Sequence, residues 1–186
     1  MNSIKIKLYP FALMYPILRL ARVIIQSKFQ KKVSFDSTHN ECIYLMVLPQ
    51  DIDLFMELNN GRYVTLLDLG RFSYGAKVNM GSFLKKNKWS LTIVGTYNEY
   101  RHRLRLFQRF ILETKIIGYD EKWFYFFQKI QRNDKTHMAS IVKFSYTSST
   151  GLVVPRDVIK AMGLNYDPTQ LPYWIKELTK HQIFKK

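Results

Sequence analysis

The chain has 186 residues, of which 47% are hydrophobic and 15% aromatic, so it can bury the core of one domain and is not a disordered chain. It carries 29 Lys and Arg against 14 Asp and Glu, and this net charge of +15 favours an anionic partner. Zinc-finger spacing, a glycine-rich phosphate loop and the aromatic motifs of RNA-recognition sheets are all missing from the sequence, so no nucleic-acid partner is expected.

Cysteine and histidine usage narrows the chemistry further. A single cysteine, Cys42, excludes an internal disulfide framework and favours a reducing compartment such as the cytoplasm. The four histidines are scattered, and none stands at a metal-ligand spacing from a Cys or a carboxylate. We therefore expect a cytoplasmic protein without a metal site and without a bound cofactor.

Residues 1–32 differ from the rest, and the sequence predicts a separate N-terminal segment there, before a domain over residues 33–186. A helix beginning near Pro16 places Arg19, Arg22 and Gln26 on one polar stripe, with apolar residues around the remainder. This pattern is typical of a helix at a membrane surface, and a helix packed on the domain or on a dimer partner is the alternative. A membrane-spanning helix is disfavoured because each central arginine costs roughly 2.5–3.5 kcal/mol. The segment contains seven basic residues and no acid: Lys5, Lys7, Arg19, Arg22, Lys28, Lys31 and Lys32.

From Val33 onward the chain alternates between apolar and polar residues and is rich in aromatics, which predicts strands. Turn-forming residues at 118–120 and 132–135 predict hairpins, so the last three strands are expected to be antiparallel neighbours. The five predicted strands cover residues 41–48, 89–100, 104–117, 122–132 and 137–147.

One strong helix is predicted over residues 60–77, with apolar side chains around nearly its whole circumference, so most of its sides should be buried. Short helices are predicted over residues 155–162 and 171–180. A long buried helix followed by an antiparallel run of strands predicts an α+β protein of the hot-dog fold, in which a curved sheet wraps the central helix.

Residues 48–63 resemble the signature of hot-dog acyl-CoA thioesterases of the 4-hydroxybenzoyl-CoA thioesterase type. In that family two aspartates one residue apart precede an Asn-Asn pair and a helix tyrosine, and here these are Asp51, Asp53, Asn59, Asn60 and Tyr63. Residues 67–71, 100–107 and 118–120 are similar to the branch of thioesterase superfamily member six, which also begins with a hydrophobic, basic segment. The resemblance covers about residues 33–175.

One residue departs from the family pattern. Family members commonly have a histidine two residues before the Asn-Asn pair, and this chain has Glu57 there. Any substrate contact or acid–base chemistry of that histidine is therefore in doubt for this chain, although position 57 stays a candidate substrate contact.

The resemblance implies a homodimer that hydrolyses the thioester of a fatty acyl-CoA or related acyl carrier, with coenzyme A present only as part of the substrate. Such hydrolysis needs an activated water or a carboxylate nucleophile, and donors for the oxyanion. Asp53 matches the family's catalytic aspartate, and the unsatisfied N–H groups at the helix start near Asn60 are the expected donors. The side chain of Asn59 or Asn60 is expected to orient the water.

Each of these residues also has a structural interpretation. Asp51 and Asp53 can close the loop through Asx-type hydrogen bonds, Asn59 can cap the helix, and Tyr63 can be a core residue rather than a substrate contact. Asp68, two turns beyond the helix start, is the rival catalytic carboxylate, and an ion pair with Arg71 at i, i+3 is its alternative.

Arg101, Arg103 and Arg105 alternate along the sequence, so we expect them to project from one face of a strand. Arginine forks match phosphate oxygens, which predicts contact with the nucleotide end of coenzyme A. A solvated or dimer-facing basic surface is the alternative.

Two other functions stay open. A non-catalytic acyl- or lipid-binding protein of the same fold is favoured by Glu57 in place of the histidine. A dehydratase is disfavoured, because such enzymes pair a histidine with a carboxylate and no histidine is near residues 51–63 in the sequence.

Overall fold

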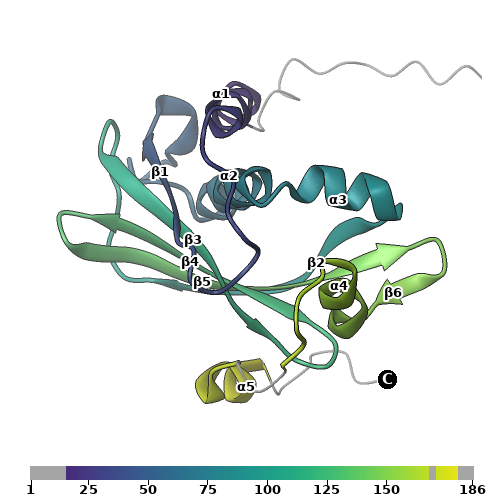
Figure 1. Cartoon of the computed structure of the whole chain (residues 1–186). Coiled ribbons are helices and arrows are strands. Elements are labelled where there is room, and N and C mark those ends of the chain that lie inside the picture. Colours follow the sequence, from purple (N-terminus) through teal and green to yellow (C-terminus); the bar gives the residue numbers. More distant parts are fainter. Residues whose placement is uncertain (1–15, 168–170, 180–186) are drawn as a thin grey trace, which may run out of the picture.

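An antiparallel sheet of six strands curls around one long helix in the computed structural model, which describes residues 16–167 and 171–179 (Figure 1). The strand order is β1-β3-β4-β5-β2, and β6 pairs with the end of β5, so β1 and β2 are the edge strands. The strands are β1 (Glu41–Met46), β2 (Ser90–Tyr100), β3 (Arg109–Tyr119), β4 (Phe124–Arg132), β5 (Lys135–Ser148) and β6 (Gly151–Val153).

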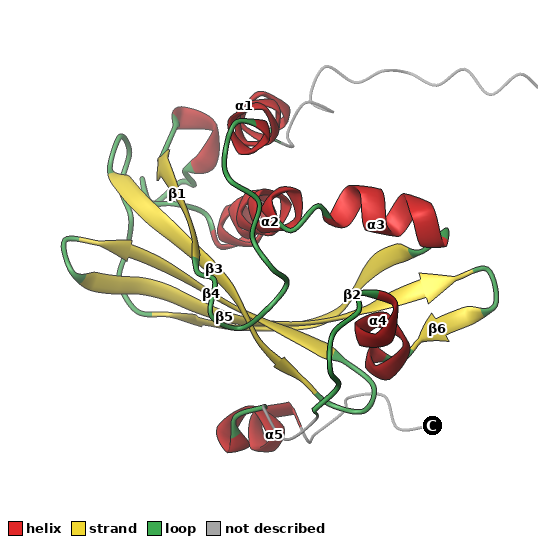
Figure 2. Cartoon of the chain, in the orientation of Figure 1, coloured by secondary structure: helices red, strands yellow, loops and turns green. Residues whose placement is uncertain are grey.

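The helices lie on both faces of this sheet (Figure 2). The central helix α2 covers one face, α1 lies on top of α2, and α5 lies against the opposite face. This arrangement confirms the predicted hot-dog fold. The helices are α1 (Ile17–Lys28), α2 (Asn60–Lys77), α3 (Met80–Asn87), α4 (Pro155–Ala161) and α5 (Tyr173–Thr179), with a short 3-10 turn η2 (Pro49–Asp51) before α2.

Burial on most of its sides holds α2 in place, as its apolar circumference predicted. Leu67 and Leu69 pack with Leu112 of β3 in one buried cluster, and Val23 of α1 closes the same cluster from above. Because α1 covers the side of α2 that faces away from the sheet, most of α2 is removed from water, although Phe72 stays 48% exposed.

The predicted hairpins are confirmed, with β3, β4 and β5 as antiparallel neighbours. Asn133 and Asp134 both have positive φ, 49° and 58°, which is the turn geometry that matches the twist of two-residue hairpins. Register shifts interrupt the pairing at Ile93/Gly95 and at Ile116/Gly118, and such bulges increase the local bend of a sheet.

Three features differ from the sequence predictions. The short helix α3 and the strand β6 were not predicted, and the strand expected from residue 104 begins only at Arg109. Helix α3 lies between two residues in left-handed conformation, Asn79 and Lys88, and packs Phe83 and Leu84 against an aromatic cluster. Its stability therefore comes from tertiary packing rather than from its own eight residues.

Residues 1–15 lie outside the described residues, so the boundary at residue 32 stays a prediction. No helix in the described part of the chain combines the length and the apolar character needed to cross a membrane.

Gly70 is required where α2 meets the sheet. A Cβ at this position would collide with Oγ1 of Thr114 and would lie 3.0 Å from Nε2 of Gln128, both fully buried, whereas a Cβ on Gly75 of the same helix would meet only Met80 at 3.6 Å. We expect Gly70→Ala to lower the free energy of unfolding by about 1–3 kcal/mol through overpacking. Gly75→Ala should raise it by about 0.5–1 kcal/mol, because alanine favours helix. Urea unfolding of both variants measures this difference, and equal stability of the two would contradict the close packing.

Candidate active site

Residues 52–58 form a tight hairpin that leads into α2. Ile52 and Leu58 pair as an isolated bridge, and the Asp53 amide donates to the Glu57 carbonyl at 2.9 Å. Oδ1 of Asp53 accepts from the Phe55 amide at 2.9 Å, so this carboxylate does close the loop through one oxygen. Its Oδ2 has no hydrogen-bond partner among the described residues. Asp53 is thus fixed in position with one carboxylate oxygen still available.

Asp51 is a structural residue. It is 2% exposed, and its Oδ2 accepts from Nη2 of Arg19 at 2.6 Å and from the Leu48 amide at 2.9 Å. The loop-closing interpretation of Asp51 is therefore confirmed. The same contact corrects the expected orientation of Arg19, which points into the protein toward Asp51 rather than outward with Arg22 and Gln26.

The start of α2 presents one available backbone donor. Asn59 caps the helix, because its side chain accepts from the Gly61 amide at 2.9 Å and its carbonyl accepts from the amides of Arg62 and Tyr63. For the exposed Asn60, no acceptor of its amide is found in the described chain. A helix N-terminus carries partial positive charge, so this amide can stabilise an oxyanion.

Tyr63 is a core residue, 3% exposed, and packs edge-on against Tyr100 with ring centroids 5.3 Å apart. Burial raises the pKa of Tyr63 to about 12, so its phenol stays protonated at neutral pH. The Tyr100 hydroxyl donates to the Asn60 carbonyl at 3.4 Å. Tyr100 was missed by the sequence reasoning as a site residue, although it begins the segment 100–107 that carries part of the family resemblance.

The three arginines lie on the loop between β2 and β3, so the prediction that they project from one face of a strand is wrong. The loop is attached to the hairpin instead, because the Leu104 carbonyl accepts from the Leu58 amide at 2.7 Å and residue Arg105 bridges to Glu57. Nε of Arg103 lies 3.2 Å from Oε2 of Glu57. All three arginines are exposed, and Arg101 pairs with Glu99. They are therefore close to the start of α2, as a role in substrate binding requires.

His137 of β5 anchors this loop and was also missed. Its Nδ1 lies 3.1 Å from the Arg103 carbonyl and 3.2 Å from the His102 carbonyl, so it is the donating nitrogen. Burial lowers the pKa of His137, which keeps the ring neutral at pH 7. No local sequence pattern could have indicated this contact, because it joins residues 34 positions apart.

Asp68 does not join this cluster. It forms an ion pair with Arg71, and Nη1 of Arg71 donates to Oε1 of Gln128 at 2.5 Å. Gln128 in turn donates to Oγ1 of Thr114 and to the Leu67 carbonyl, both at 2.9 Å. The ion-pair interpretation of Asp68 therefore describes its contacts, which hold α2 on the sheet.

The arrangement as a whole brings together three groups at the start of a buried helix: the Asp53 carboxylate with one oxygen unpaired in the described chain, the Asn60 amide without an acceptor there, and the exposed arginines. No group of three metal-ligating side chains occurs within residues 16–167 and 171–179. These are the groups that acyl transfer to water needs: a base or nucleophile, an oxyanion donor and cations for an anionic substrate.

Comparison with known proteins gives matches in both sequence and structure. A family model described as the thioesterase-like superfamily matches residues 47–167. Protein THEM6 of Danio rerio is 30% identical over 107 residues, which are 58% of this chain and 52% of that protein. Protein THEM6 of Drosophila melanogaster is 28% identical over 162 residues, which are 84% of this chain and 83% of that protein. The chain thus spans about half the length of the Danio rerio relative that it matches.

Among solved structures, the probable thioesterase YbaW from Escherichia coli superposes with a TM-score of 0.60. The match covers 66% of this chain and 98% of YbaW at 15% sequence identity. At this identity the likeness shows a shared fold, which agrees with the strand order and central helix described above.

Proposed function

Because the chain belongs to the thioesterase-like superfamily, we propose that it hydrolyses the thioester of a fatty acyl-CoA or a related acyl carrier. The observation that carries this proposal is the Asn60 amide, which is unpaired within the described chain at the start of α2 and follows the hairpin that holds Asp53. A thioester carbonyl bound at this amide would have its developing negative charge stabilised by the helix.

In the proposed reaction, Oδ2 of Asp53 takes a proton from a water molecule whose oxygen attacks the thioester carbon. The oxyanion accepts a hydrogen bond from the Asn60 amide, and the side chain of Asn60 helps to orient the water. The C–S bond then breaks, and the leaving thiolate receives the proton from Asp53. Direct attack by Asp53 on the carbonyl carbon is the other course open to the same carboxylate.

Arg101, Arg103 and Arg105 bind the nucleotide end of coenzyme A in this proposal. Arg105 has no ion pair among the described residues, and Arg103 and Arg101 pair with Glu57 and Glu99 through exposed contacts that a phosphate can replace. Exposed ion pairs contribute little free energy, so exchanging a carboxylate for a phosphate costs little.

Replacing Asn60 tests the backbone donor directly. Asn60 is the first residue of α2, and Asn59 before it has φ −61° and ψ 139°, a conformation that the residue before proline adopts readily. Asn60→Pro therefore removes the amide hydrogen while keeping the helix, and we expect kcat to fall by about 10²–10³. Asn60→Ala, which keeps the amide, is the matched control, and Asp53→Asn should lower kcat by about 10²–10⁴.

The measurement is steady-state hydrolysis of acyl-CoAs of several chain lengths by the purified protein and these variants. If Asn60→Pro and Asn60→Ala are equally active, the backbone amide is not the oxyanion donor. If the protein binds acyl-CoA but releases no coenzyme A, the second function, a non-catalytic acyl-binding protein, is correct. The Glu57–Arg103 ion pair in place of the family histidine is the observation that favours this second function.

We also propose that the protein acts as a homodimer joined through β2. This strand is an edge of the sheet, and it exposes Ile93, Val94 and Tyr97. Tyr100, whose hydroxyl contacts Asn60, ends the same strand, so a partner paired along β2 would approach the candidate site.

If the protein is this dimer, sedimentation equilibrium should give twice the chain mass of 22.2 kDa. Val94→Lys with Tyr97→Lys should shift the protein toward the monomer, and an unchanged dimer would place the interface elsewhere.

Membrane association through α1 is a further part of the proposal. The helix packs on α2 through Val23, and its outer side exposes Leu18 by 88% and Ile25 by 56%, while Phe29, directly after the helix, is 87% exposed. Such a surface beside exposed basic residues suits an anionic lipid interface. We expect the triple change of these three residues to Ser to reduce co-sedimentation with anionic vesicles. The same change at Tyr173, Trp174 and Leu178 of α5 is the control, and equal loss in both variants would refute a specific role of α1.

A further inference from the structure

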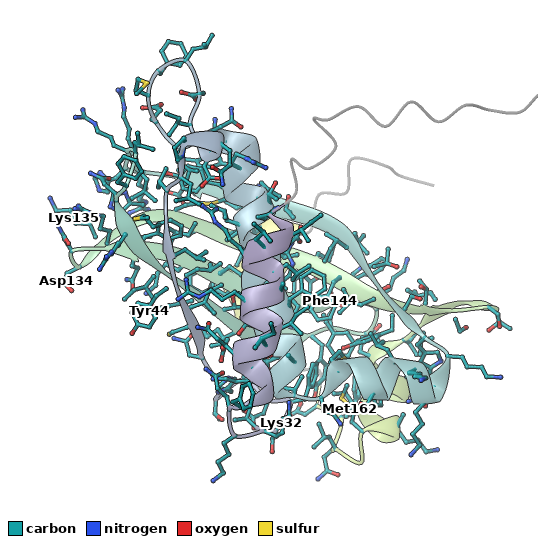
Figure 3. All side chains as sticks on the ribbon, turned by 90° about the horizontal axis from the view of Figure 1, so that it is seen from above. Lys32, Tyr44, Asp134, Lys135, Phe144 and Met162 are labelled. Carbon is teal, nitrogen blue, oxygen red and sulfur yellow. The ribbon has the colours of Figure 1, made fainter. Side chains whose placement is uncertain are left out.

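A groove of about 1210 Å³ lies between α1 and the turn that joins β4 to β5, away from the candidate active site. Figure 3 shows the edge strand β1 with Tyr44 beside α1, and Asp134 of the turn and Lys135 at the start of β5 beyond it on the same side. The volume is comparable to that of pockets that bind small molecules. None of Asp53, Asn60 or the three arginines of the β2–β3 loop lines this groove.

Arginine side chains from three separate elements line the groove. Arg22 comes from α1, Arg109 from β3 and Arg132 from the end of β4, and none of them has an ion pair within the described chain. Among the described residues of the lining, Asp134 is the one acidic residue. Arg19 also lines the groove, but Asp51 neutralises it. The lining therefore has a surplus of cations that are available to a ligand.

The remaining lining is largely apolar. Val23 contributes from α1, Phe29 from the residue that follows α1, Ile43 and Leu45 from β1, and Ile111 from β3. Phe29 is 87% exposed, which is an unfavourable position for an aromatic ring unless something covers it. A ligand that covers this wall would remove apolar surface from water.

From this combination we propose that the groove binds an acyl chain with an anionic head group, either a carboxylate or a phosphate. The head group is held by Arg22, Arg109 and Arg132, because guanidinium groups form paired hydrogen bonds with carboxylate and phosphate oxygens. The acyl chain lies along the apolar wall of α1 and β1. An inorganic anion would leave that wall uncovered, and a neutral lipid would leave three arginines unpaired.

This proposal goes beyond thioester hydrolysis and does not depend on it, because the two sites share no residue. It requires α1 to stay where the Arg19–Asp51 contact holds it, since α1 forms one wall of the groove. Binding of an amphiphile in this groove, such as a free fatty acid or a single-chain phospholipid, is thus a second binding activity of the same chain.

Binding is measured by calorimetry on the full chain with dodecanoate, dodecyl phosphate, dodecanol and inorganic phosphate, each below its micellar concentration. We expect saturable binding of at least one of the two anionic amphiphiles, and the tighter of them identifies the carboxylate or the phosphate as the preferred head group. Binding of dodecanol with equal affinity, or of inorganic phosphate as tightly as dodecyl phosphate, would overturn the proposal. Absence of any binding would overturn it as well.

Variants locate the binding in the groove. Arg22→Gln, Arg109→Gln and Arg132→Gln together should raise the Kd by about tenfold or more. Lys85→Gln, Arg156→Gln and Lys160→Gln remove the same charge from α3 and α4 and should leave the Kd unchanged. Gln26→Trp places a large ring in the groove from an exposed position of α1 and should abolish binding. Thermal unfolding checks that each variant is folded, and equal Kd values for the two triple variants would refute the site.

Cys42 gives an independent readout, because it lines the groove and is the one cysteine of the chain. Burial raises the pKa of its thiol, so its modification is best followed at alkaline pH. A bound amphiphile should slow the reaction of Cys42 with a thiol reagent in the wild-type protein and not in Gln26→Trp. Calorimetric binding without this protection would place the ligand outside the groove.

Discussion

The buried contact between Arg19 and Asp51 is the interaction on which the arrangement of the site depends. Asp51 is 2% exposed and binds Arg19 of α1 and the Leu48 amide, while its carbonyl accepts from the amide of Asn59, the cap of α2. Asp51 therefore joins α1, the turn η2 and the start of the central helix, and its partner Arg19 also donates to the Met46 carbonyl at the end of β1. Removing Asp51 would leave the largely buried Arg19 without its anion. Removing Arg19 would leave the buried Asp51 with only Arg62, 3.7 Å away, as a counter-charge, and either change carries a large penalty. The position of α2 relative to its entry loop is fixed by this contact.

That anchoring explains why the two aspartates of the motif have different tasks. The carboxylate and the carbonyl of Asp51 are both engaged in structural contacts, so neither group is available to bind a substrate. The carboxylate of Asp53, two residues on, is held through Oδ1 alone in the described chain, while its backbone pairs within its own hairpin. The same division holds in the Asn-Asn pair, in which Asn59 satisfies three amides of the first turn and Asn60 keeps an amide with no acceptor in the described chain. One residue of each pair builds the helix entry, and the other is available for chemistry.

Sequence patterns predicted the parts of the fold that rest on local rules. The bounds of α2 follow from a capping asparagine and an unbroken apolar circumference, and the β4–β5 hairpin follows from Asn133 and Asp134. The loop of residues 101–108 was missed because tertiary contacts, through His137 and Glu57, override an alternating pattern that reads as a strand. The inward orientation of the Arg19 side chain was missed for a similar reason, since its partner Asp51 lies 32 residues away and no helical periodicity reveals this contact.

The inward orientation of the Arg19 side chain also determines which other side chains of α1 face solvent. With Arg19 and Val23 committed to the interior, the opposite side must carry Leu18 and Phe29 outward, although exposing them is unfavourable in water. The same orientation leaves Arg22 over the groove beside β1. In a chain with a net charge of +15, an apolar surface bordered by arginines that have no ion pair in the described chain is the kind of surface that the proposed anionic amphiphile would approach. One buried ion pair thus both fixes the entry to the central helix and orients the surface that α1 is proposed to present to lipid.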